Sequence, residues 1–123
     1  MKTTARDFAI FKKEFLHWQK ALGLTEWRIC FKVGAFDTDY ARIRADGPGR
    51  IATVEMTSII DRNDDHWDPR VSARHEALEL LLMGLNHVAE RRGSVTFDQI
   101  LEADHAIIRR LEYLFDSIEN LHI

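Results

Sequence analysis

The chain has 123 residues, 46% of them hydrophobic, which is enough for one compact domain with a core and too few for two domains of ordinary size. Its 17 basic and 20 acidic side chains give a formal net charge of −3, so the composition lacks the excess of positive charge that is typical of proteins binding nucleic acid or an anionic membrane. We therefore expect a single domain over residues 1–123, with neither nucleic acid nor a membrane among its partners.

Cysteine usage and the start of the chain bear on the cellular compartment. Cys30 is the single cysteine, so no intrachain disulfide can form, and the first residues lack the apolar segment of a secretory signal. No apolar run approaches the ~20 residues that cross a bilayer. These features predict a cytoplasmic protein in which Cys30 is an inert interior thiol.

The first half of the chain predicts one helix and three strands. Apolar residues recur at steps of three and four over residues 4–22, which is typical of an amphipathic helix, and Gly23 ends it. Strict alternation predicts a strand over residues 27–33, followed by strands over 40–45 and 50–56. We expect an antiparallel sheet in which the strand 50–56 is a candidate edge for holding an extended peptide.

The second half predicts two helices. Asp68 is a candidate N-cap and Pro69 a first helical residue, so a helix is expected over about 69–91. Its predicted apolar stripe consists of Val71, Leu78, Leu81, Leu82 and Leu85. After a break at 91–94, a long final helix is expected to pack on it as a helical hairpin. The fold class is therefore α+β: an N-terminal helix, a three-stranded antiparallel sheet and a two-helix C-terminal hairpin.

The segment Arg74-His75-Glu76-Ala77-Leu78-Glu79 carries the strongest chemical signal. It has the layout of the H-E-x-x-H motif, with Glu79 where that motif has its second histidine. Four residues make about one helical turn, so His75 and Glu79 project side by side and could share one metal ion. Glu76 could then act on the water that such an ion binds.

A third ligand is expected from the final helix. Asp104 lies near the middle of that helix's apolar stripe, whereas Glu102 points nearly the opposite way and His105 lies at the border. A carboxylate on an apolar face is costly unless it is paired, hydrogen bonded or bound to metal, which favours Asp104, with His105 and Glu102 as alternatives. Without an ion, His75 would be a partly buried histidine bonded to Asp104, and Glu76 and Glu79 would form a solvated helix shoulder.

Three segments resemble the zincin superfamily of metallopeptidases, in particular its SprT-like and small phage-type members. They are Trp27-Arg28-Ile29, the helix segment 74–82, and the sequence Asp-His-Ala-Ile-Ile-Arg-Arg-Leu-Glu at 104–112. The resemblance implies a minimal zincin-like fold, zinc as cofactor and a peptide or protein substrate. It also implies His75 as a ligand, Glu76 as the general base and Asp104 as the downstream acidic ligand.

Glu79 is the departure from that family pattern. One imidazole with two carboxylates is a harder and more anionic ligand set than zincins usually have, so Mn²⁺ or Mg²⁺ becomes conceivable beside zinc. The alternative function is a catalytically inactive zincin-like binding or assembly module that has lost the metal site.

Overall fold

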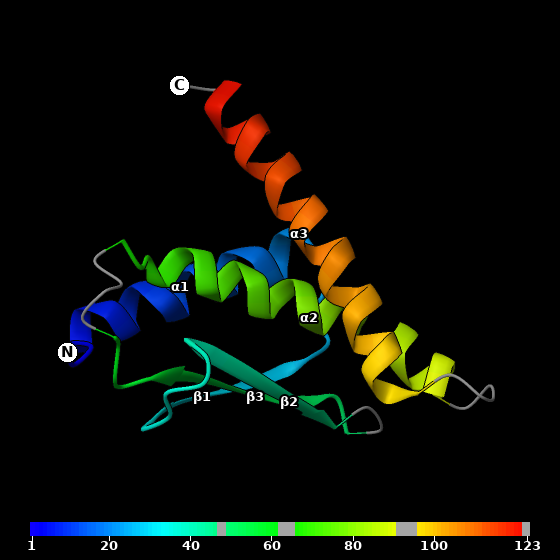
Figure 1. Cartoon of the computed structure of the whole chain (residues 1–123), viewed down its shortest axis with the longest axis horizontal. Coiled ribbons are helices and arrows are strands. Elements are labelled where there is room, and N and C mark those ends of the chain that lie inside the picture. Colours follow the sequence, from blue (N-terminus) through cyan, green and yellow to red (C-terminus); the bar gives the residue numbers. More distant parts are fainter. Residues whose placement is uncertain (47–48, 62–65, 91–95, 122–123) are drawn as a thin grey trace. The chain divides into compact units, whose positions relative to one another are not determined.

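The computed structural model describes residues 1–46, 49–61, 66–90 and 96–121, with the backbone alone at residues 84–90 and at several positions of the last helix. The fold is α+β, as predicted. Figure 1 shows its elements, which are α1 (Ala5–Ala21), β1 (Arg28–Gly34), β2 (Ala41–Asp46), β3 (Ile51–Thr57), α2 (Pro69–Glu90) and α3 (Phe97–Leu121). The chain divides into two compact units, Met1–Leu81 and Leu82–Ile123.

Helix α1 begins and ends where the sequence predicts. Thr4 is the N-cap of a capping box, because its hydroxyl accepts from the N–H of Asp7 and the Asp7 carboxylate accepts from the N–H of Thr4. Gly23, just beyond the helix, has φ 70°, a left-handed conformation that glycine adopts without a steric penalty. These two ends fix the helix over the residues that carry its apolar stripe.

The sheet is mixed, with strand order β1-β3-β2, and the prediction of an all-antiparallel sheet was wrong in this respect. β3 pairs in parallel with β1 and antiparallel with β2. Because β3 is bonded on both sides, it cannot be the edge that holds an extended peptide, and that prediction is also wrong. The open edges belong to β1 and β2.

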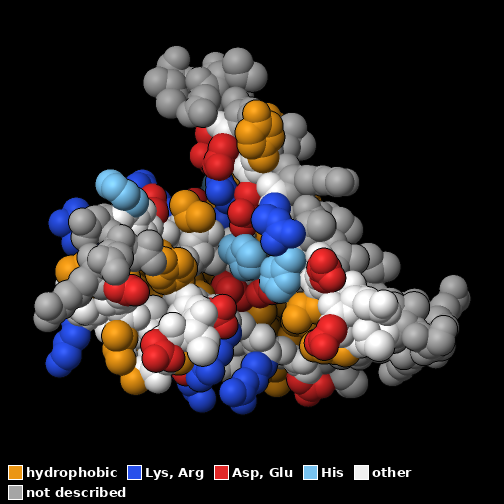
Figure 2. Space-filling model, viewed as in Figure 1, with side chains coloured by type: hydrophobic (Ala, Val, Ile, Leu, Met, Phe, Trp, Pro, Cys, Tyr) orange, Lys and Arg blue, Asp and Glu red, His pale blue; other side chains and the backbone are white. Residues whose placement is uncertain are grey.

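Burial explains why β3 takes the centre. Ala52, Val54 and Met56 are fully buried on the side of the sheet that the helices cover. β2 instead directs Arg42 and Arg44 to the opposite side, which suits an edge strand better than a central one. In Figure 2, basic and acidic side chains lie side by side along the lower border, where Figure 1 draws the sheet.

Cys30 lies on the uncovered face of the sheet and is exposed, so the prediction of an interior thiol was wrong. The register pairs Cys30 with Thr53, on the face opposite to that of Val54. The alternation that turns the half-buried Phe31 toward the helices therefore turns Cys30 outward. The sequence pattern predicts a strand with one buried face, and Cys30 lies on the other face together with Arg28 and Lys32.

The core of the first unit lies between the sheet and two helices. α1 and the first turns of α2 lie on the same face of the sheet (Figure 1). Phe15 packs edge-on against Phe31, with ring centroids 5.6 Å apart, which places α1 over β1. The most deeply buried side chains of this core are Phe11, Phe15, Ala52, Val54, Met56, Ala73, Ala77 and Leu78.

α2 packs through a different face from the predicted stripe. Val71 and Leu81 are 47% and 38% exposed, whereas Ala73 and Ala77 are fully buried. Small side chains let a helix approach its neighbours closely, so they mark the packed face here although they contribute little hydrophobicity. Leu78 is buried as predicted, and the side chain of Leu85 lies outside the described residues.

The second unit contains the end of α2 and the whole of α3. A capping box begins α3, since the N–H of Gln99 donates to the Thr96 hydroxyl and the N–H of Thr96 to the Gln99 side chain. The break predicted at residues 91–94 lies outside the described residues. In the described part of the chain, no helix combines the length and the apolar character that crossing a membrane requires.

Candidate metal centre

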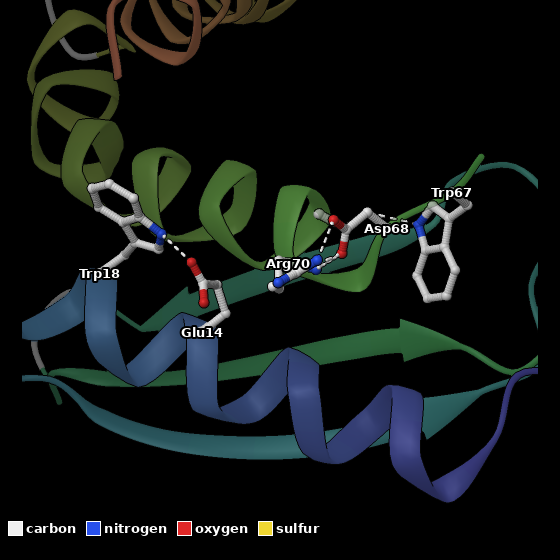
Figure 3. A network of polar contacts seen from close by, with 6 residues as sticks. Glu14, Trp18, Trp67, Asp68 and Arg70 are labelled. Carbon is white, nitrogen blue, oxygen red and sulfur yellow. Dashed lines mark hydrogen bonds and ion pairs between the residues drawn. The ribbon is translucent and has the colours of Figure 1, made fainter. Parts of the chain in front are cut away.

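A network of polar contacts fixes the start of the helix that carries the motif. The carboxylate of Asp68 accepts from the backbone N–H of Arg70 at 2.9 Å and from its guanidinium at 3.2 Å (Figure 3). The Asp68 carbonyl also accepts from the N–H of Val71. Asp68 therefore caps α2 as predicted, and Pro69 occupies the first helical position.

The charge of Asp68 is stabilised in this position. Burial acts to raise the pKa of the Asp68 carboxyl, but hydrogen bonds from Arg70 and the positive charges of Arg70 and Arg74 outweigh it and lower that pKa. The carboxylate thus stays ionised at the positive end of the helix dipole, where a negative charge is favourable. Nearby, the indole N–H of Trp67 donates to the hydroxyl of Ser72 at 2.9 Å (Figure 3).

His75 and Glu79 lie side by side one turn apart on α2. The Nε2 atom of His75 is 3.9 Å from Oε1 of Glu79, and the two side chains are 30% and 21% exposed. That distance is too long for a hydrogen bond. It is compatible with two ligands of one ion, since Zn–N and Zn–O bonds are each about 2.0–2.2 Å long. The structure thus brings these two predicted ligands together.

Glu76 occupies the adjoining face of α2 and is buried, with only 4% of its surface exposed. Glu76 is therefore not on a solvated surface of the helix, which is where the interpretation without a metal ion places it. Burying a carboxylate is costly unless specific interactions compensate for its lost hydration. A position next to His75 and away from bulk water is what the predicted general base requires.

Arg74 is a second buried charge in the same segment, and it is only 6% exposed. It contributes to the lowered pKa of Asp68 through its positive charge. The sequence shows three consecutive polar residues here, Arg74 to Glu76, inside a helix that is otherwise largely buried. Buried charged side chains are uncommon in a packed helix face, and Arg74 is not among the site residues that the sequence predicts.

Asp104 lies on the buried face of α3. It is 5% exposed, between Ile100 at 8% and Ile108 at 0%, while Glu102 is exposed and His105 is half-buried. This order around the helix agrees with the predicted one. Asp104 belongs to the second unit and the pair His75–Glu79 to the first, so a shared site remains a prediction from the sequence.

Two hollows of the first unit lie away from the motif. One of about 570 Å³ adjoins the β1–β2 loop, and one of about 630 Å³ lies between α1 and the start of α2. Neither is lined by His75, Glu76 or Glu79. Trp67 lines the larger hollow and Tyr40 the smaller, and their rings stack with centroids 5.8 Å apart.

Comparisons of the chain with protein-family models, with curated proteins and with solved structures found no match. The resemblance to zincins therefore rests on the sequence segments at 27–29, 74–82 and 104–112.

Proposed function

We propose that this chain is a metal-dependent peptidase of the zincin type, with His75, Glu79 and Asp104 as ligands of a divalent cation, zinc in the first instance. The observation that carries the proposal is the His75–Glu79 pair, with 3.9 Å between its imidazole nitrogen and carboxylate oxygen and a buried Glu76 next to it. Asp104 is included as a ligand because the sequence pattern predicts it and because it lies on the buried face of α3.

The donor set fits a divalent cation. One imidazole nitrogen and two carboxylate oxygens are all ligands that zinc accepts, and the two carboxylates widen the choice toward harder ions such as Mn²⁺. When bound, such an ion supplies Lewis acidity, which polarises the substrate carbonyl and makes an attacking water more acidic.

The protein's own residues carry the proton transfers in this mechanism. Glu76 takes the proton of the attacking water and later gives it to the amine that leaves when the peptide bond breaks. Its burial keeps bulk water from competing for that proton. His75 and Glu79 hold their ligand atoms on a single helical turn, so little reorganisation accompanies binding.

The metal content of the purified protein tests this proposal. The protein is dialysed against zinc and then against metal-free buffer, and bound metal is measured by mass spectrometry of the elements. We expect near-stoichiometric zinc in the wild type and in His17→Ala, which removes an exposed histidine of α1. His75→Ala should lose the zinc.

Two results would redirect the interpretation. Absence of retained zinc, Mn²⁺ or any other metal from the wild type would favour the alternative, a zincin-like binding module without catalysis. Zinc retained equally by His75→Ala would remove His75 as a ligand. For the third ligand, Asp104→Asn should weaken zinc binding, while Glu102→Gln, an exposed acid on the same helix, should not.

A further inference from the structure

β1 is an edge strand with one side open among the residues that the structure describes. Its single neighbour is β3. The N–H of Arg28 donates to the Arg50 carbonyl, and the Gly34 carbonyl accepts from the N–H of Ser58, both at 2.8 Å. These two residues thus turn their backbone groups toward β3. Because backbone direction alternates along a strand, Ile29, Phe31 and Val33 turn their N–H and C=O groups to the open edge.

The open edge lacks the usual protection against pairing with another chain. β1 contains no proline, and the residues that face outward with their backbone are apolar. Val33 is 46% exposed although its side chain lies on the helix-covered face of the sheet. The charges of β1, Arg28 and Lys32, lie on the opposite face.

α1 adds an apolar side chain along the same border. The Gln19 amide of α1 donates to the carbonyl of Trp27, the residue just before β1. Leu16 precedes Gln19 by three residues, so both lie on the same flank of α1. The opposite flank, with Ile10 and Glu14, faces the hollow at the start of α2. Leu16 is 49% exposed, so this flank of α1 presents an apolar side chain to solvent.

We propose that this edge binds a second copy of the chain, with β1 pairing antiparallel to its counterpart across a twofold axis at Phe31. In this register Phe31 faces the second copy's Phe31, and Ile29 faces its Val33. All three residues then form backbone hydrogen bonds across the interface, because each turns its N–H and C=O outward. A twofold dimer buries the same apolar patch on both copies.

Overlap and charge together select this register. With the axis at Ile29 or Val33, only residues 28–30 or 32–34 would face β1 of the second copy, whereas the whole strand does so with the axis at Phe31. Moving the axis to Cys30 would place Arg28 opposite Lys32 of the second copy, and moving it to Lys32 would place two lysines opposite each other. Like charges directly opposite are destabilising in an antiparallel pair. With the axis at Phe31, Lys32 faces Cys30 and Arg28 faces Gly34, so no like charges are opposed.

The proposed dimer is independent of the proposed peptidase activity. β1 and β2 form opposite borders of the sheet (Figure 1), and the start of β2 lies beside the start of α2, where Tyr40 stacks on Trp67. Dimerisation through β1 therefore leaves the β2 border and residues 69–81 of α2, which carry His75 and Glu79, free. Loss of metal in His75→Ala should not change the oligomeric state.

Sedimentation equilibrium of the full-length chain tests the dimer. We expect a reversible dimer at micromolar concentration, and a dissociation constant at least tenfold larger in Val33→Lys, because two lysines would enter one apolar interface. The matched control is Ile51→Lys, which replaces a residue of similar exposure, 40%, on the central strand and should leave the dimer unchanged. A wild type that stays monomeric up to roughly 100 µM would overturn the proposal, as would equal effects of the two variants.

Disulfide trapping tests the register. Residues that face each other in a hydrogen-bonded antiparallel pair have Cα atoms about 5.5 Å apart, within the range that a disulfide spans. The variant Ile29→Cys/Val33→Cys, with Cys30→Ser, should therefore form covalent dimers under mild oxidation, and Ile51→Cys with Cys30→Ser should not. Covalent dimers through native Cys30 alone, with none in the double variant, would overturn the register at Phe31.

Discussion

His75 and Glu79 lie one turn apart on α2, with Nε2 of the imidazole 3.9 Å from Oε1 of the carboxylate. This is the i, i+4 spacing at which the two histidines of an H-E-x-x-H motif lie on a helix, with a carboxylate in place of the second imidazole. A histidine at position 79 would complete the H-E-x-x-H motif on a backbone that already has the required geometry.

Glu79→His should therefore bind zinc more tightly than the wild type, by at least tenfold in dissociation constant, because imidazole is a softer ligand that zinc prefers over Mn²⁺ and Mg²⁺. Competition with a chromophoric chelator measures the change. Glu26→His, at an exposed site with only a 3.6 Å contact to Arg50, is the matched control and should have no effect. Equal affinity of Glu79→His and the wild type would argue against a metal site on this turn.

Glu76→Gln separates catalysis from metal binding. The amide keeps the size of the buried side chain but cannot accept the proton of water, so hydrolysis of a fluorescent casein substrate should fall by about 10² or more. Zinc content should stay at the wild-type level. If Glu76→Gln keeps full activity, Glu76 is not the general base; if it loses its zinc, the residue supports the site in another way.

Much of the fold follows from local sequence signals, because those signals act over a few residues. The caps at Thr4, Asp68 and Thr96 lie next to the helices that they begin, and the alternation around Phe31 fixes the faces of β1. Strand order depends on contacts between distant residues instead. The sequence order predicts β2 beside β1, but β3, with its three fully buried apolar side chains, takes the central position.

In the candidate site, too, the features set by neighbouring residues can be predicted from the sequence, and those set by contacts between distant residues cannot. The spacing of His75 and Glu79 is a property of one helical turn and follows from the sequence. The packed face of α2 does not, because hydrophobicity favours Val71 and Leu81 whereas close packing uses Ala73 and Ala77. The burial of Glu76 follows from that rotation of the helix.

Substitutions on α2 test which of its faces is packed. Ala77→Leu should destabilise the protein by about 1–3 kcal/mol, because Ala77 is fully buried and extra atoms would be forced into a packed core. Val71→Ala should cost less than about 1 kcal/mol, since Val71 is 47% exposed. Urea unfolding followed by circular dichroism measures both. A larger loss of stability for Val71→Ala than for Ala77→Leu would mean that α2 packs through the apolar stripe that the sequence predicts.

Glu55 makes the stability of the sheet depend on pH. The guanidinium of Arg42 donates to Oε1 of Glu55 at 3.0 Å, and this bond, with the charges of Arg42, Arg44 and Lys32, lowers the pKa of Glu55 although burial opposes the shift. A carboxyl group whose pKa is lower in the folded state stabilises the protein above its unfolded pKa, and this contribution disappears as the pH falls through the folded pKa.

Glu55→Gln should therefore be less stable than the wild type at pH 7, by about 0.5 kcal/mol for a partly exposed ion pair. The difference should begin to shrink near the ordinary glutamate pKa of about 4.3 and vanish below the lowered pKa of Glu55 in the folded protein. Urea unfolding at a series of pH values measures the difference. Glu26→Gln, whose carboxylate is 3.6 Å from Arg50 at an exposed site, serves as the control with a smaller effect. A difference between Glu55→Gln and the wild type that stays constant from pH 7 to pH 2 would mean that the Glu55 carboxylate contributes through packing and not through its charge.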